Sequence, residues 1–176
     1  MSKNTQIAPT LKENLLEPDD LIVSKTDVKG HITYANACFL SLSLFKEKDI
    51  LNKPHNIIRH PDMPMAVYQM LWDTLHKGDE FFGIVKNLSA DGSFYWVFAN
   101  ITPSFDESGK TIGYFSVRRQ ANRELVTIMG NLYKKMVQEE KRHSDDKRAI
   151  KASTQIFNNF IDEQGVSYNE YLISFA

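Results

Sequence analysis

The chain has 176 residues, 42% of them hydrophobic, which is enough for one folded domain with a modest extension. Its 21 basic and 22 acidic residues give a net charge of −1, and this balance gives no indication of a nucleic acid or an anionic membrane as partner. The apolar runs are too short to insert into a bilayer, and residues 1–17 lack the apolar segment of a signal peptide. We therefore expect a cytoplasmic protein.

The N-terminal part predicts an arm followed by a hairpin. Residues 1–17 form a polar arm that mixes Lys, Asn and Glu with scattered apolar residues. Residues 21–27 are typical of a strand, residues 27–30 of a turn, and residues 31–35 of the returning strand.

A helical pattern begins at Asn36, which we interpret as its N-cap. Cys38 lies inside this pattern, among apolar neighbours, and is expected to be a buried small hydrophobe. Because it is the only cysteine, the chain can form neither an internal disulfide nor a thiolate-rich metal site.

The segment Pro54-His55-Asn56-Ile57-Ile58-Arg59-His60-Pro61-Asp62-Met63-Pro64 has a composition unlike that of an ordinary connection. Prolines stiffen the backbone, while basic and acidic groups are spaced two or three residues apart. This combination suits a loop and a short helix that hold polar groups around a ligand. The alternative is a charged loop that pairs with itself, with His60 or Arg59 bound to Asp62.

The rest of the first 122 residues predicts a helix and three strands. Residues 65–75 form an amphipathic helix. Residues 81–88, 94–103 and 112–119 alternate as strands, with an Asp-Gly turn after the first of them. The order of two strands, helices and a three-stranded meander predicts an α+β domain with helices gathered on one face of the sheet.

The chain after Gln120 is predicted to be a helical extension, residues 123–176. Its first helix has apolar residues at spacings of four, three and four, a seam that needs a partner surface: Leu125, Met129, Leu132 and Met136. Residues 139–148 are almost wholly charged, which indicates a solvated helix face or a linker. The seam and the last apolar residues indicate packing against the domain itself or against a second chain, as in a homodimer.

Residues 18–122 resemble the PAS sensor domain, in the branch of the aerotaxis and energy-taxis receptors. The resemblance is carried by the loop at residues 54–64, by Gly83-Ile84-Val85-Lys86-Asn87, and by Tyr95-Trp96-Val97 with Ala99-Asn100. It implies a five-stranded antiparallel sheet with flanking helices and a non-covalently bound FAD between them. It also implies a redox or oxygen-linked sensor that feeds chemotaxis. We expect no enzymatic activity, because the sequence shows no sign of a nicotinamide site and no nucleophile elbow.

The same resemblance places the flavin site on seven positions: Arg59, His60, Asp62, Trp72, Phe81, Asn87 and Asn100. Phe81 stands where related receptors often have tryptophan, and it keeps an aromatic face. On chemical grounds, the flavin ring needs an aromatic slot, its pyrimidine edge suits amides, and its diphosphate suits Arg59. We expect Asn87 and Asn100, on adjacent strands, to face one cavity, with His60 and Asp62 ordering its entrance.

The chain resembles the split form of this system, a PAS-only protein that works with a separate membrane-bound chemotaxis transducer. We expect it at the inner face of the membrane through that partner. A change in flavin electron count would alter the hydrogen bonds of Asn87 or Asn100 and so move the attached helices.

Three alternatives remain open. The domain is a cofactor-free interaction module, a haem-binding PAS domain with His60 as the axial ligand, or, with least support, a metal site at His55, His60 and Asp62. A thiol-adduct photoreceptor is disfavoured, because the residues around Cys38 do not form the motif that it requires.

Overall fold

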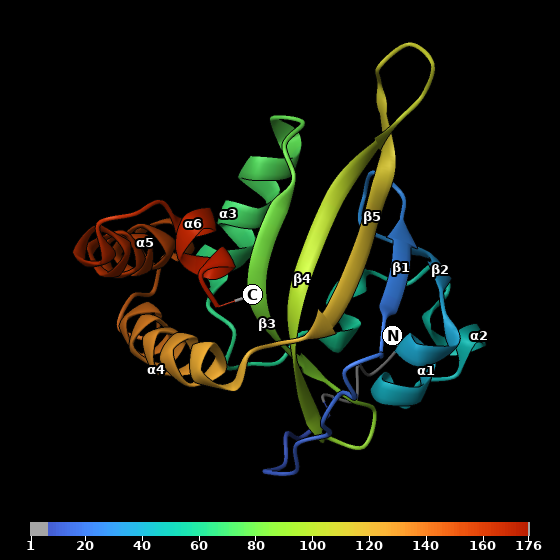
Figure 1. Cartoon of the computed structure of the whole chain (residues 1–176), viewed down its shortest axis with the longest axis horizontal. Coiled ribbons are helices and arrows are strands. Elements are labelled where there is room, and N and C mark those ends of the chain that lie inside the picture. The colour runs from blue at the N-terminus through green and yellow to red at the C-terminus, as the bar shows by residue number, and fades with distance from the viewer. Residues whose placement is uncertain (1–6, 176) are drawn as a thin grey trace.

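The computed structural model describes residues 7–175 and contains one five-stranded antiparallel sheet (Figure 1). Its order is β2-β1-β5-β4-β3, so that β3 is an edge strand. The strands are β1 (Ile22–Thr26), β2 (Ile32–Ala35), β3 (Phe81–Leu88), β4 (Phe94–Phe105) and β5 (Thr111–Gln120). The predicted α+β architecture with five strands is confirmed.

Four helical segments connect β2 to β3: α1 (Ala37–Ser43), α2 (Glu47–Ile50), the 3-10 helix η1 (His55–Ile58) and α3 (Met65–His76). Asn36 caps α1 as predicted, because its side chain accepts a hydrogen bond from the Phe39 amide at 3.0 Å. The predicted polar loop therefore includes η1 and leads directly into α3.

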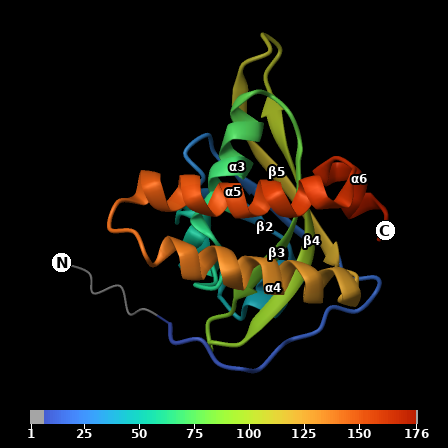
Figure 2. The same ribbon diagram turned by 90° about the vertical axis from the view of Figure 1, so that its left-hand side faces the viewer.

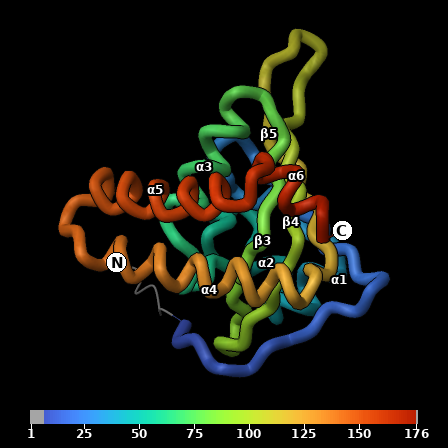
Figure 3. The backbone as a smooth tube through the Cα atoms, turned by 60° about the vertical axis from the view of Figure 1, so that its left-hand side comes forward, coloured from blue at the N-terminus to red at the C-terminus, as the bar shows by residue number. Residues whose placement is uncertain are grey.

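The described part of the N-terminal arm, residues 7–17, lies along the turn between β3 and β4 (Figure 3). The Phe94 amide donates to the Lys12 carbonyl at 2.9 Å, and the Asn14 amide donates to the Phe94 carbonyl at 2.7 Å. Glu13 pairs with Arg123 at 2.6 Å, so the arm also reaches the start of the C-terminal region.

Three helices complete the chain: α4 (Arg123–Glu140), α5 (Asp146–Gln164) and α6 (Tyr168–Ile173). Figure 2 shows α4 and α5 as an antiparallel pair that lies across the edge of the sheet and over α3. α4 and α6 pack against β3, whose outward backbone groups would otherwise be free to pair with another strand.

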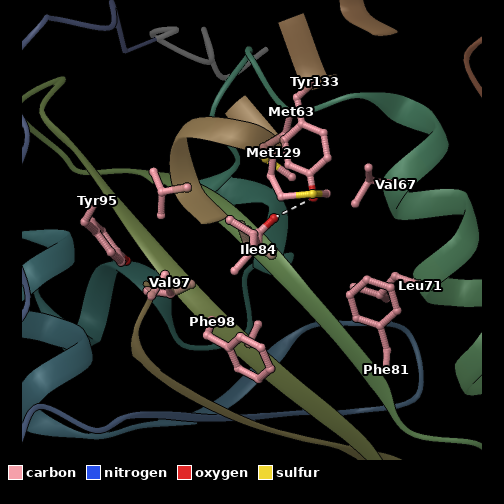
Figure 4. Packing of buried hydrophobic residues seen from close by; sticks show 14 of the residues in the cluster. Met63, Val67, Leu71, Phe81, Ile84, Tyr95, Val97, Phe98, Met129 and Tyr133 are labelled. Carbon is pink, nitrogen blue, oxygen red and sulfur yellow. Dashed lines mark hydrogen bonds between the residues drawn. The ribbon is translucent and has the colours of Figure 1, made fainter. Parts of the chain in front are cut away.

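The apolar seam of α4 is buried against the chain's own domain. Met129 and Tyr133 point into the core beside β3, and the Tyr133 hydroxyl donates to the Ile84 carbonyl at 2.8 Å (Figure 4). Tyr133 also stacks on Trp96 of β4, with ring centroids 6.4 Å apart. This burial removes the seam as a reason to expect a dimer.

The N-terminus of α3 is capped from a distance. Its N-cap residue, Pro64, offers no side-chain acceptor. The carboxylate of Glu140, at the end of α4, accepts from the amides of Met65 at 2.9 Å and Ala66 at 3.1 Å. A negative charge at a helix N-terminus satisfies free amides and interacts favourably with the helix dipole. Glu140 thereby joins the C-terminal helices to α3.

Replacing this carboxylate is expected to loosen the contact between α3 and α4. Glu140→Gln should lower the free energy of unfolding by about 1–2 kcal/mol, because a buried cap loses its charge. Urea denaturation measures the change. Glu163→Gln removes an exposed charge from α5 and should leave stability within about 0.5 kcal/mol of the wild type. Equal stabilities for the two variants would contradict the capping role.

Candidate functional site

A cavity of about 420 Å³ lies between α3, η1 and one face of the sheet, a size typical of small-molecule sites. It reaches the surface at Lys29, Pro54 and Asn56, which are exposed. Its deeper wall is contributed by alternate residues of the strands and by the facing side of α3. The main lining residues are Ser24, His55, Arg59, Tyr68, Leu71, Trp72, Leu75, Asn87, Ala99, Ile101, Tyr114, Ser116 and Arg118.

The charge of this lining has one sign. Lys29, Arg59 and Arg118 border the cavity, and no carboxylate does so within the described chain. Arg59 also stacks over the Tyr68 ring, 4.0 Å from its centroid, which orients its guanidinium between the loop and α3. The cavity therefore favours a ligand that carries negative charge.

Arg118, on β5, is the most deeply placed of these cations, with 4% of its surface exposed. Its Nη2 donates to Nε2 of His55 at 2.8 Å and to Oγ of Ser24 at 3.2 Å. Its Nη1 is buried and has no partner among the described residues. Burial lowers the pKa of Arg118 to about 10, so the side chain remains charged at neutral pH.

His55 meets this guanidinium as a neutral acceptor. Burial, and secondarily the charge of Arg118, lower the pKa of His55 to about 3. Since Nε2 accepts from Arg118, the ring proton of the neutral imidazole lies on Nδ1. Arg118 is thus held by neutral groups.

Two further polar groups that line the cavity lack partners in the described chain. The side-chain amide nitrogen of Asn87 (Nδ2) and the hydroxyl of Ser116 are both buried and have no partner among the described residues. Buried polar groups in folded proteins nearly always find a partner. Unpaired groups around a cavity of this size indicate the polar contacts of a ligand.

The aromatic side chains Trp72 and Tyr114 lie together in the wall, which also includes Tyr68. Their rings meet edge to face, with centroids 5.3 Å apart. Trp72 packs against Gly30 of the β1–β2 turn, where a Cβ would lie only 3.4 Å from the indole and where φ is +81°. Glycine is therefore suited to this position both for its backbone conformation and for space.

Of the seven predicted site residues, three line the cavity: Arg59, Trp72 and Asn87. The backbone of Arg59 forms an isolated antiparallel bridge with Asn87, which fixes the loop against β3. Their contact with a flavin stays a prediction.

The expectation that Asn100 shares this cavity with Asn87 is wrong. Asn87 pairs with Tyr95 and Asn100 with Phe82 in the β3–β4 ladder. Because Phe82 and Asn87 are an odd number of residues apart, Asn100 lies on the opposite face of the sheet. Its side chain donates to Glu80 at 3.1 Å.

His60 and Asp62 also lie outside the cavity lining, where they interact with each other. The Asp62 amide donates to Nδ1 of His60 at 3.1 Å, and the Asp62 carboxylate pairs with Lys86 at 2.7 Å. Burial and the charge of Lys86 lower the pKa of His60 to about 4, so its 3.5 Å approach to Asp62 is not an ion pair at neutral pH. The loop residues His60 and Asp62 thus share one backbone hydrogen bond, while the ion pair of Asp62 is made with Lys86 of β3 and not with His60 or Arg59 as the self-paired alternative had it. His60 does not line the cavity, where a haem ligand would have to lie.

Phe81 is buried but does not line the cavity. Its ring lies toward α3 in the core (Figure 4), over Gly83, where a Cβ would be 2.7 Å from the ring. Gly83 therefore leaves the space that the Phe81 ring fills, and the predicted ring-stacking role has no geometric support.

The sequence reasoning missed Ser24, His55, Tyr68, Ser116 and Arg118. A signal for two of them was available, because Ser116 and Arg118 follow Tyr114 at intervals of two on one strand. If Tyr114 faces the cavity, both must face it as well. His55 lay in the singled-out loop and was considered only as a metal ligand.

Cys38 and the loop histidines form neither a reactive thiol site in the cavity nor a metal site among the described residues. Cys38 is half-buried and does not line the cavity, and burial raises the pKa of its thiol. Among residues 7–175 no three His, Cys, Asp or Glu side chains are placed to hold a metal ion. No helix in that range is both long and apolar enough to span a bilayer.

Comparisons with known proteins place this chain in a family whose fold it shares. Residues 32–118 match the family described as PAS fold. The aerotaxis receptor of Escherichia coli is 41% identical over 125 residues, which are 71% of this chain and 24% of the receptor. The nitrogen fixation regulatory protein of Klebsiella pneumoniae is 30% identical over 115 residues, which are 65% of this chain and 23% of the regulator. The chain thus spans about a quarter of the length of these relatives.

Solved structures show the same fold. The light-oxygen-voltage domain of the blue-light photoreceptor Aureochrome1 in its dark state superimposes with a TM-score of 0.57 at 19% identity, covering 62% of this chain and 82% of that domain. A light-oxygen-voltage domain studied with a flavin analogue gives a TM-score of 0.55 at 19% identity, with coverages of 62% and 82%.

The low pKa of His60 predicts a pH-dependent stability. Its folded-state pKa of about 4 lies below the ordinary histidine pKa of 6.5, so between these values the unfolded chain binds a proton that the folded chain does not. The free energy of unfolding should therefore fall as pH is lowered from 7 to 5, with His60 contributing about 2 kcal/mol, at about 1.4 kcal/mol per pH unit.

Urea denaturation at pH 7 and pH 5 measures this contribution. His60→Asn should lose about 2 kcal/mol less than the wild type between pH 7 and pH 5. His76→Asn, at an exposed position, should lose as much stability on acidification as the wild type. If His60→Asn loses as much stability on acidification as the wild type, His60 is not the buried neutral group described above.

Proposed function

Because this chain carries a PAS domain of the aerotaxis-receptor family, we propose that its cavity binds a flavin, FAD, and that the protein is a redox and energy sensor for chemotaxis. The observation that carries the proposal is the set of unpaired buried groups around a cationic cavity: Asn87 Nδ2, Ser116 Oγ and Arg118 Nη1. These groups offer donors to a ligand with acceptor atoms and negative charge.

The residues present suit such a ligand. Leu71, Leu75 and Ile101 offer an apolar slot for a flat ring, with Trp72 beside it. The Asn87 amide matches the donors and acceptors at the edge of a flavin ring. Arg59 suits the diphosphate, as the family resemblance implies. A bound flavin would supply reversible electron transfer.

The sensing step that we propose begins at Asn87. Of the two asparagines expected to respond to the flavin, it is the one that lines the cavity. A change in flavin charge would favour a different orientation of its amide. Since Asn87 is bridged to the Arg59 loop, that change would reach α3 and then Glu140 and the C-terminal helices.

The output that we propose is contact with a separate membrane-bound chemotaxis transducer, made through the C-terminal helices. The protein would act in the cytoplasm at the inner face of the membrane, without inserting into it. It would sense without catalysing turnover, so that adding reduced nicotinamide should give no sustained oxidation by the flavin-loaded protein.

Purified protein should show flavin absorbance, and mass spectrometry of the ligand released by heating should identify FAD. Asn87→Ala should weaken FAD binding about tenfold, because one buried hydrogen bond is lost. Asn100→Ala, on the opposite face, should bind FAD within about twofold of the wild type. Flavin fluorescence quenching measures both affinities.

Three results would contradict the proposal. A colourless protein that does not take up added FAD would favour a cofactor-free interaction domain. A haem spectrum would favour the haem-binding alternative. Equal loss of binding in Asn87→Ala and Asn100→Ala would place the flavin elsewhere.

A further inference from the structure

The guanidinium of Arg118 is a buried charge with no counter-charge among the residues that the structure describes. Its described hydrogen-bond partners, Ser24 and His55, are neutral. The other charged groups that line the cavity, Lys29 and Arg59, have the same sign as Arg118. Taking an unpaired charge out of water is costly, so this arrangement lowers the stability of the ligand-free protein.

The unpaired atom is placed where a ligand can reach it. Arg118 lines the cavity, and its Nη1 has no partner within the described chain. The next residue, Arg119, is exposed on the opposite face of the sheet, with its guanidinium 4.9 Å from the Phe98 centroid. Strand β5 therefore carries one arginine that lines the cavity and a neighbouring arginine that is exposed on the surface.

We propose that Arg118 is the charge-selecting residue of this site: it supplies the positive charge for a negatively charged ligand edge and makes the bound flavin easier to reduce. This inference rests on the proposed function. Arg118 favours the flavin that has received two electrons from a reductant such as dithionite and one proton from water, because that form carries one more negative charge than the oxidised form.

This role predicts opposite effects of one substitution on the free and the loaded protein. Arg118→Met replaces the charged side chain with a shorter, unbranched apolar one. The flavin-free variant should have a thermal midpoint equal to or above that of flavin-free wild type, because a buried unpaired charge is gone. Its affinity for FAD should fall at least tenfold, and the reduction potential of bound FAD should become more negative.

Two further variants separate charge from packing. Arg118→Lys keeps the charge and should give a potential between those of the wild type and Arg118→Met. Arg119→Met removes an arginine from the other face and should change neither the affinity nor the potential. The measurements are thermal denaturation of flavin-free protein, fluorescence titration with FAD, and a dithionite titration against a dye of known potential.

The outcomes distinguish this inference from the proposed function. If the wild type binds FAD and Arg118→Met leaves the potential unchanged, the charge-selecting role is wrong while the flavin site stands. A flavin-free Arg118→Met protein that is less stable than the wild type would assign Arg118 a structural role instead. If the wild type takes up no FAD, the proposed function fails and the inference fails with it.

Discussion

The cavity of this domain is organised around a buried arginine that has no carboxylate partner in the described part of the chain. Arg118 is held by Ser24 and a neutral His55, and its Nη1 has no partner among residues 7–175. Such a group is unfavourable unless a ligand satisfies it. With Asn87 and Ser116 unpaired around the same cavity, the ligand-free fold is incomplete in its hydrogen bonding, and the missing partners are those that an anionic, acceptor-rich ligand provides.

The strands and helices were predictable because their periodicities are local. The site was predictable only in part. Asn100 was misplaced because face assignment depends on hairpin register, and the separation between Asn87 and Asn100 does not show which face each occupies until the turn is fixed. The same period of two, applied from Tyr114, would have indicated Arg118. Asp62 was expected either to face the cavity or to pair within its own loop, whereas its ion pair is with Lys86, which only the folding of β3 against the loop brings near.

Contacts between residues far apart in the sequence determine how the C-terminal helices pack, which local sequence patterns do not show. Glu140 caps α3 from 75 residues along the chain, and Tyr133 binds a free carbonyl of the edge strand β3. These two contacts explain why the α4 seam is buried inside one chain. They also link the helix that lines the cavity to the helices beyond residue 118, where the match to the PAS family ends. A change at the cavity thereby has a physical route to the C-terminal surface.

The central claim is that this cavity is a flavin site. Its most direct test is a structure of the protein crystallised after incubation with FAD. The account predicts ring density between α3 and the sheet, within hydrogen-bond distance of Asn87 and Arg118. A cavity that holds only ordered water in the presence of saturating FAD, with the unpaired groups bound to that water, would contradict it.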